Sequence, residues 1–216
     1  MTRAIDSLVR SGNQCPVTSP EDLAPAPRLA LAWQPAVTRP ALAALFALDA
    51  RLAGVVTAAK EPLLVQIRLA WWRERLAELG SGNSPPEPLL AALAGAWGSA
   101  ARELAPLIDG WEARLCADSA LGDLAEGRAQ ALAAYAHLAG APKDAPAAAE
   151  AGRRWSRAEG AGADPAGRLA PLALSHRLRG VAVLGALATC ALERGEGLLE
   201  GRGAVAAAWR VGLLGR

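Results

Sequence analysis

The most informative hydrophobic pattern lies between Glu61 and Leu79, where it predicts an amphipathic helix with a wide apolar face. Pro62 suits the first turn of a helix, because the N–H that proline lacks would have no partner within the helix there. Two apolar rows follow at helical spacing. They are Leu64, Ile67 and Trp71, and Val65, Leu69, Trp72, Leu76 and Leu79. We expect such a helix to be covered on more than one side, which favours a bundle of helices.

Helical spacing of apolar residues continues along most of the remaining chain. Thr38 followed by Pro40 is typical of a helix start, and we expect this helix to reach about Ala59. Residues 1–27 end in a Pro-rich string that disfavours packing, so we expect a flexible N-terminal tail there and one helical domain over 28–216. Further helices are expected at 89–101, 104–115, 121–138, up to Ser156, 169–178, 181–199 and 204–216, with a loop at 81–86 and a Gly-rich break at 160–167.

Ala and Leu supply most of the apolar volume in this chain of 216 residues, of which 52% are hydrophobic and 20% charged. Both residues favour helix, whereas the β-branched residues that favour strands are scarce. The length suits one substantial domain. Composition and pattern together predict an all-α fold, a single-domain helical bundle.

The charge of the chain is nearly balanced, with 23 basic and 21 acidic residues and a net charge of +2. No strong electrostatic field is available to hold nucleic acid, so we expect no nucleic-acid partner. The three cysteines follow no metal-ligand or redox spacing, which fits a reducing compartment.

The sequence also bears on localisation. The first residues lack the continuous apolar run of a secretory signal, and the run Val181–Ala191 is shorter than the roughly 20 residues that span a bilayer. We therefore expect a cytoplasmic protein. The terminal segment Ala204–Arg216 carries Trp209 and arginines beside Val and Leu, which leaves a weak peripheral contact with the inner membrane as a further option.

Four strings carry a resemblance to a known family: LAWQP at 31–35, Arg39 with LAALFALD at 42–49, KEPLLVQIRLAWWRERL at 60–76, and AEGRAQAL at 125–132. Together they resemble the squalene/phytoene synthase family, all-α isoprenoid synthases that join two prenyl diphosphates head to head. The Trp-Trp-Arg string is the most specific of them. The resemblance covers roughly Arg28 to Gly140 and implies an isoprenoid synthase-type bundle, here shortened at the C-terminus. A non-catalytic branch of the family, which includes a mitochondrial respiratory complex I assembly factor, has helices similar to the first two here.

Active members of that family carry two Asp-rich motifs on facing helices, which bind diphosphate through bridging Mg²⁺. In this chain small neutral residues stand where the first motif has carboxylates: Ala53, Gly54 and Thr57. Asp49 lies one turn earlier, and the stretch expected to hold the second motif offers Glu159 and Asp164. The resemblance therefore implies a degenerate member with no catalytic residues, no metal ligands and no cofactor.

Charged residues on the predicted helices are candidates for a pocket or ligand site. Asp49 and Arg51 interrupt an apolar helix, either as remnants of a pocket or as a narrow solvent-facing stripe, and the stripe is the commoner case. Asp109 and Glu112 lie one turn apart and form the best carboxylate pair, although a surface pair near Arg114 is the commoner arrangement.

Arginine and tryptophan residues complete the candidate set. Four arginines could together bind a phosphate or carboxylate, although solvated surface charge is the commoner role. Trp71 and Trp72 point about 100° apart on a helix, which favours a core role. The full set is Arg39, Asp49, Arg68, Trp71, Trp72, Arg73, Asp109, Glu112 and Arg128.

The sequence thus favours a binding or assembly module whose partner is an apolar or isoprenoid-like small molecule or a protein. The alternative is a divergent prenyltransferase of isoprenoid biosynthesis that uses Mg²⁺ with Asp49, Asp109 and Glu112 in a rearranged site. Geometry separates the two. Convergence of the three carboxylates within metal-bridging reach at one cavity would favour the enzyme, and their separation would disfavour it.

Overall fold

The computed structural model describes residues 22–58, 61–79, 87–115, 120–160 and 167–214. Helices are the regular elements of these residues, and none of them forms a strand, so the predicted all-α fold is confirmed for this part of the chain. The α-helices are α2 (Pro25–Trp33), α3 (Arg39–Ala58), α4 (Pro62–Glu78), α5 (Pro88–Trp97), α6 (Ala105–Ala113), α7 (Ala120–Leu138), α8 (Ala145–Glu159), α9 (Arg179–Arg194) and α10 (Gly201–Leu214), with short 3₁₀ helices that include η2 (Gly98–Leu104).

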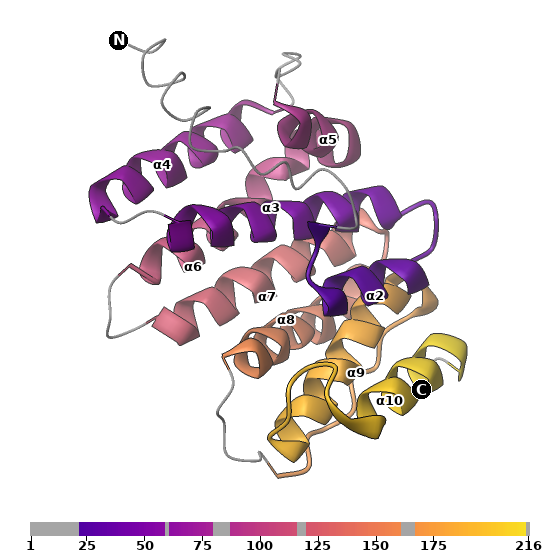
Figure 1. Cartoon of the computed structure of the whole chain (residues 1–216). Coiled ribbons are helices and arrows are strands. Elements are labelled where there is room, and N and C mark those ends of the chain that lie inside the picture. The colour runs from indigo at the N-terminus through magenta and orange to yellow at the C-terminus, as the bar shows by residue number, and fades with distance from the viewer. Residues whose placement is uncertain (1–21, 59–60, 80–86, 116–119, 161–166, 215–216) are drawn as a thin grey trace.

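From α6 to α10 the helices are stacked in chain order, whereas α4 and α5 lie on one side of α3 and α2 lies beside α9 (Figure 1). α3 packs against α4, α5 and α6, and α7 lies between α6 and α8. α8 in turn packs on α9, and α9 packs on both α10 and α2. The start of the chain is therefore joined to its end through α2 and α9, while α7 occupies the middle of the stack.

α3 is the central core helix. Its length and apolar composition would be enough to cross a membrane, but 56% of that apolar window is buried inside the protein. The buried side chains surround the helix almost completely, as its broad apolar pattern predicts. They include Leu42, Leu45, Phe46, Leu48 and Leu52.

α4 differs from the sequence prediction in how much of it is covered. The row that runs from Val65 to Leu79 is buried. The other row is not, because Leu64 is 46% and Ile67 42% exposed, and Leu63 beside them is 66% exposed. Periodicity shows which residues share a face, but it does not show whether another helix lies against that face.

Several boundaries differ from those expected; α9, for example, ends at Arg194 and not at 199. α2 begins at Pro25, inside the segment predicted as a tail, because proline is tolerated in a first turn; the rest of that tail lies outside the described residues. α5 ends at Trp97, and a 3₁₀ helix follows in place of its last turn. The helix predicted at 169–178 is wrong, since 167–175 has no helix. Side chains from elsewhere bind its backbone instead: Glu193 accepts from the Leu169 N–H, and Asp144 from the Ser175 N–H.

A buried glutamine joins the two ends of the described chain. The Nε2 of Gln34 donates to the Thr38 hydroxyl and to the Arg177 carbonyl, each at 2.7 Å, and its Oε1 accepts from the Gly180 N–H at 2.8 Å. A Cβ on Gly180 would lie 2.6 Å from the Ala30 carbonyl oxygen, so glycine is required where α9 meets α2. Gln34 thereby fixes the α2–α3 corner against the start of α9.

Tyr135 on α7 anchors the beginning of α3. Its hydroxyl donates to the Thr38 carbonyl at 3.1 Å, and its ring lies 6.3 Å from that of Trp97, whose indole N–H donates to the Ala41 carbonyl at 2.9 Å. Burial raises the pKa of Tyr135 to about 12 against an ordinary value of 10.0, although its hydrogen bonds to Thr38 and Gln34 act in the opposite direction.

We expect the free energy of unfolding to fall as pH rises from 10 toward 12. The raised pKa means that the unfolded chain releases the Tyr135 proton first, so this contribution is complete below pH 10 and is lost as pH approaches the folded pKa. Tyr135 is the one tyrosine of the chain, so phenolate absorbance reports it directly. A folded protein that titrates with the same midpoint as the urea-unfolded chain would contradict this, and Tyr135→Phe provides the blank.

Two glycines allow α7 to lie very close to its neighbours. A Cβ on Gly127 would lie 2.5 Å from the Pro106 carbonyl oxygen at the start of α6. A Cβ on Gly152 of α8 would lie 2.7 Å from the Arg128 carbonyl oxygen. Both contacts are with backbone, which cannot move without shifting a helix, so glycine sets the spacing of α6, α7 and α8.

Gly152→Ala should therefore destabilise the protein by about 1–3 kcal/mol, because α8 must move away from α7. Gly54→Ala is the matched control, since Gly54 is also inside a helix but has no atom within 4 Å of its Cβ position. It should stabilise by about 0.5–1 kcal/mol through the higher helix propensity of alanine. Urea unfolding measures both, and equal effects of the two substitutions would contradict the close approach.

Candidate functional site

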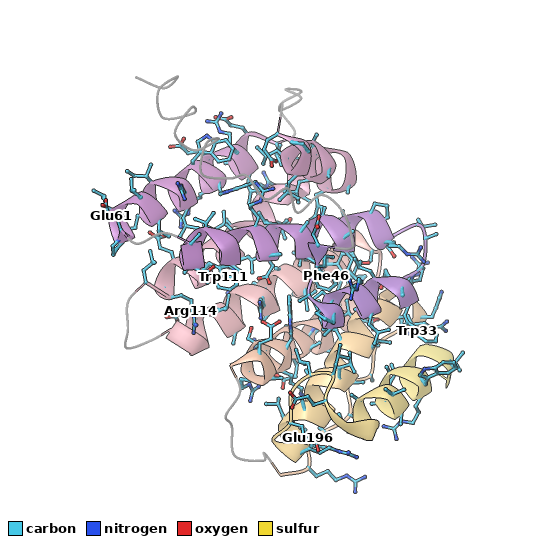
Figure 2. All side chains as sticks on the ribbon, in the orientation of Figure 1. Trp33, Phe46, Glu61, Trp111, Arg114 and Glu196 are labelled. Atoms are coloured by element: carbon cyan, nitrogen blue, oxygen red, sulfur yellow. The ribbon has the colours of Figure 1, made fainter. Side chains whose placement is uncertain are left out.

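Asp49 lies near the middle of α3, with its carboxylate buried beneath the helix. Arg128 of α7 forms a two-point ion pair with it: Nη2 lies 2.7 Å from Oδ2, and Nε lies 3.0 Å from Oδ1. The indole N–H of Trp111 on α6, labelled below α3 in Figure 2, also donates to Oδ1 at 2.9 Å. Both carboxylate oxygens thus have N–H partners, and α3, α6 and α7 meet here.

The guanidinium of Arg128 lies between two carboxylates. Its Nη1 is 2.6 Å from Oε2 of Glu159, the last residue of α8. Its Cζ lies 3.7 Å from the ring centroid of Trp155, whose indole N–H donates to the other Glu159 oxygen at 2.7 Å. We call Asp49, Arg128 and Glu159 the buried triad.

Charge balance explains why an arginine can be buried there. Burial by itself would lower the pKa of Arg128, but the negative charges of Asp49 and Glu159 outweigh it, so the pKa of Arg128 is raised. The guanidinium therefore stays charged. Its hydrogen bonds and its stacking on Trp155 replace the water that it has lost.

The expectation that Asp49 and Arg51 form a solvent-facing stripe is wrong. Asp49 is 4% and Arg51 6% exposed. The partners of Asp49 come from positions 62 and 79 residues further along the chain, which the pattern of α3 alone cannot show. Glu159 retains 33% exposure of its side chain, so the triad reaches the surface at the end of α8.

Arg51 occupies a second buried position on α3. Its Nη1 lies 3.4 Å from Oε1 of Glu87, and its Cζ lies 5.9 Å from the ring centroid of Trp72. Glu87 also caps α5, because its Oε2 accepts from the Leu90 N–H at 2.7 Å. Trp72 is fully buried, whereas Trp71 is half-buried and meets it edge to face at 5.2 Å. These two tryptophans serve packing here.

Arg73 holds the Asp109–Glu112 pair across the surface between α4 and α6. Its Nε lies 3.2 Å from Asp109 Oδ1, and its Nη2 lies 2.8 Å from Glu112 Oε2. The pKa of Arg73 is raised, chiefly by the hydrogen bonds that it donates to Glu112 and then to Asp109. The pair was expected near Arg114, but its partner comes from α4. All three side chains are more than a third exposed, so screening by water keeps their contribution to stability small.

The candidate arginines do not form one anion site. Arg128 is committed to the triad and Arg73 to the α6 carboxylates. Arg39 donates from Nε and Nη2 to the Gln34 carbonyl, at 3.0 and 2.7 Å, and so closes the corner between α2 and α3. Arg68 lies half-buried on α4 and shares no ion pair with any of these groups.

The described residues do not fit a Mg²⁺ site. Among them no three His, Cys, Asp or Glu side chains are arranged to hold a metal ion. Mg²⁺ needs free oxygen ligands, but both oxygens of Asp49 accept N–H groups, and Asp109 and Glu112 bind a different arginine. The hydroxyl of Thr57 donates to the carbonyl of residue 53 within α3. Asp164 lies outside the described residues.

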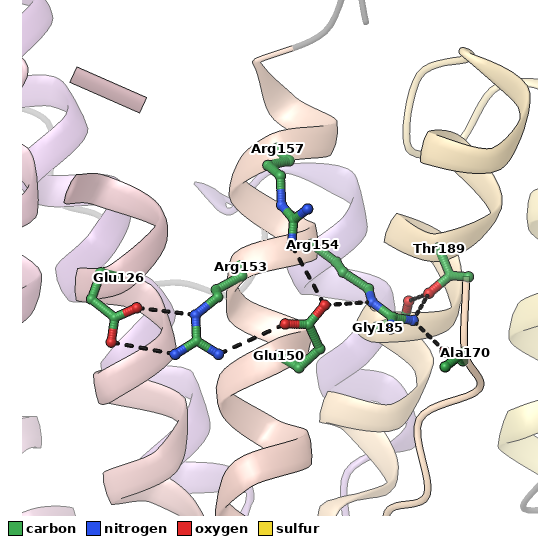
Figure 3. Close-up of polar contacts among 8 residues, drawn as sticks. All are labelled: Glu126, Glu150, Arg153, Arg154, Arg157, Ala170, Gly185 and Thr189. Atoms are coloured by element: carbon green, nitrogen blue, oxygen red, sulfur yellow. Dashed lines mark hydrogen bonds and ion pairs between the residues drawn. The ribbon is translucent and has the colours of Figure 1, made fainter. Parts of the chain in front are cut away.

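Sequence reasoning missed a third buried arginine, Arg154 on α8. It is 4% exposed and binds Glu150, the Ala170 carbonyl at 2.8 Å and the Thr189 hydroxyl at 2.9 Å (Figure 3). It therefore fastens the extended 167–175 segment to α8 and α9. The sequence did contain a signal that Arg154 is buried, because Arg154 lies three residues after Ala151 in a helical row that is otherwise apolar. That row contains Ala151, Trp155 and Ala158.

Comparison of the sequence with known families identifies the family of this chain. The family model for squalene/phytoene synthase matches residues 28–149, more than half of the chain. The chain belongs to the squalene/phytoene synthase family. No curated protein and no solved structure gives a significant match. The family segment contains Asp49 and Arg128, whereas Glu159 lies just beyond its end.

In this squalene/phytoene synthase family member, breaking the buried triad should cost more stability than breaking the exposed ion pairs of Arg73. Asp49→Ala leaves Arg128 buried with one partner fewer, so we expect a loss of about 3–5 kcal/mol in the free energy of unfolding. Arg73→Ala, at the exposed pair, should cost less than about 1 kcal/mol.

Replacing both charged side chains with apolar ones separates the cost of leaving a charge unpaired from the cost of losing packing. The double variant Asp49→Leu with Arg128→Met removes both charges and should be less destabilised than Asp49→Ala alone. Urea unfolding of the four proteins measures this. The account is wrong if Asp49→Ala and Arg73→Ala cost the same.

Proposed function

We propose that this squalene/phytoene synthase family member does not carry out Mg²⁺-dependent prenyl transfer and acts as a cytoplasmic binding or assembly module. The observation that carries the proposal is the position of the Arg128 guanidinium, 2.7 Å from Asp49 and 2.6 Å from Glu159. The carboxylate that lies closest to the first Asp-rich position is neutralised by a cation belonging to the protein itself.

Electrostatics explains why this arrangement opposes metal binding. A Mg²⁺ ion at Asp49 would lie beside a buried positive charge, and Arg128 could not leave without losing its carboxylate partners. Small side chains occupy the next two turns of α3, at Ala53 and Thr57. A diphosphate would therefore find neither a bridging metal nor a free carboxylate there.

The separation of the candidate carboxylates also weighs against the alternative of a divergent prenyltransferase. Asp109 and Glu112 are bound to Arg73 at the exposed surface between α4 and α6, whereas Asp49 is buried under α3. That alternative needs all three groups within reach of one metal ion. Their different arginine partners support the non-catalytic proposal.

The partner we propose is an apolar or isoprenoid-like small molecule or a protein. The resemblance to the non-catalytic branch with its complex I assembly factor supports a role in assembly, and fold-level analogy supports a ligand of prenyl type. Native mass spectrometry of protein purified from its own cell, with lipid extraction of the same sample, distinguishes a retained isoprenoid from a bound protein.

A direct assay tests the loss of chemistry. Purified protein incubated with Mg²⁺ and farnesyl or geranylgeranyl diphosphate should release no pyrophosphate above the level of a protein-free control, because no three acidic, His or Cys side chains among the described residues are arranged to hold the metal. Metal-dependent release would refute the proposal. If release were seen, Asp109→Asn and Glu112→Gln, at exposed positions that tolerate change, would show whether the surface carboxylates are responsible.

A further inference from the structure

α10 presents three large apolar side chains to solvent, whereas Val211 is partly buried against the core. Val205, Trp209 and Leu213 follow one another at intervals of about one helical turn and are 60%, 58% and 58% exposed. We call these three residues the outer row. A surface helix normally turns its large apolar residues inward, so this arrangement is the reverse of the usual one.

The inner side of α10 is made mostly of small residues, with Val211 beside them. Ala204 and Ala208 are each 2% exposed, and a Cβ on Gly212 would lie 2.6 Å from the Trp33 ring. Trp33, at the end of α2 in Figure 2, also meets Trp209 edge to face at 6.3 Å. Close packing on α9 and Trp33 therefore fixes which side faces outward.

The charged residues of α10 indicate what kind of partner contacts the outer row. α10 contains no acidic residue, and its charged residues are Arg202 and Arg210, of which Arg210 is exposed. Aliphatic side chains and a tryptophan with neighbouring arginines are typical of helices that lie in the headgroup region of a bilayer. The exposed apolar residues of α4 differ, because that helix carries both arginines and glutamates.

We propose that α10 docks on an anionic lipid surface, with the outer row inserted among the headgroups and Arg210 against the lipid phosphates. The helix is 14 residues long, too short to span a bilayer, so the contact is peripheral. This binding does not depend on the proposed function. The pyrophosphate assay tests the chemistry of the family site, and vesicle binding tests α10.

Flotation of the full chain with two kinds of vesicle tests the proposal. One kind is phosphatidylcholine alone, and the other contains phosphatidylglycerol as well. The wild-type protein should bind the anionic vesicles more strongly. Val205→Asp and Leu213→Asp should each weaken binding about tenfold or more, because a charged group replaces an inserted apolar one. Arg210→Gln should weaken binding about fivefold on anionic vesicles and leave neutral vesicles unaffected.

Leu63→Asp on α4 is the matched control, since Leu63 is 66% exposed but lies away from α10; it should bind like the wild type. Thermal melts followed by circular dichroism show that each variant is folded. The proposal is overturned if the wild type binds neither vesicle, if the α10 variants bind normally, or if Leu63→Asp loses binding equally. Gel filtration tests the alternative that the outer row contacts another protein chain. If the wild type binds no vesicles and Val205→Asp changes the oligomer size, the outer row belongs to a protein contact.

Discussion

The buried positive charge of Arg128 is the constraint on which the packing around α3 depends. A guanidinium cannot leave water unless acceptors surround it, and here they come from two different helices, α3 and α8. Gly152 lets α8 approach the Arg128 backbone, and Trp155 one turn later covers the guanidinium face. The relative positions of three helices therefore follow from satisfying one side chain.

The same charge bears on what the family scaffold can do in this chain. Active relatives, as the resemblance implies, bind diphosphate through Mg²⁺ held by acidic side chains. In this chain the cation beside Asp49 is the Arg128 guanidinium, which is part of the protein itself. Asp49 is thereby occupied as a structural group, which supports the binding or assembly role proposed above.

Sequence reasoning succeeded where the residue pattern of a single helix was sufficient for the prediction. The periodicity of α3, α4, α6 and α7 predicted that these helices exist, and it predicted most of the buried apolar residues of α3, because side chains on one face of a helix recur at fixed spacing. It failed where the answer lay on another element. The burial of Asp49 depends on Arg128 and Trp111, and the exposure of Ile67 depends on the absence of a covering helix among the described residues. Residues 167–175 form no helix, and distant side chains bind their backbone.

The hydrogen bonds of Gln34 imply that the family segment and the remainder of the chain form one cooperative unit. The match ends at residue 149, yet Gln34 inside it is satisfied by the backbone at Arg177 and Gly180, outside it. A fragment cut at that boundary would remove two of the three hydrogen bonds of the Gln34 amide and leave the one to Thr38. It would also remove most of α8, including the Glu159 partner of Arg128. Homology boundaries and folding boundaries therefore do not coincide in this protein.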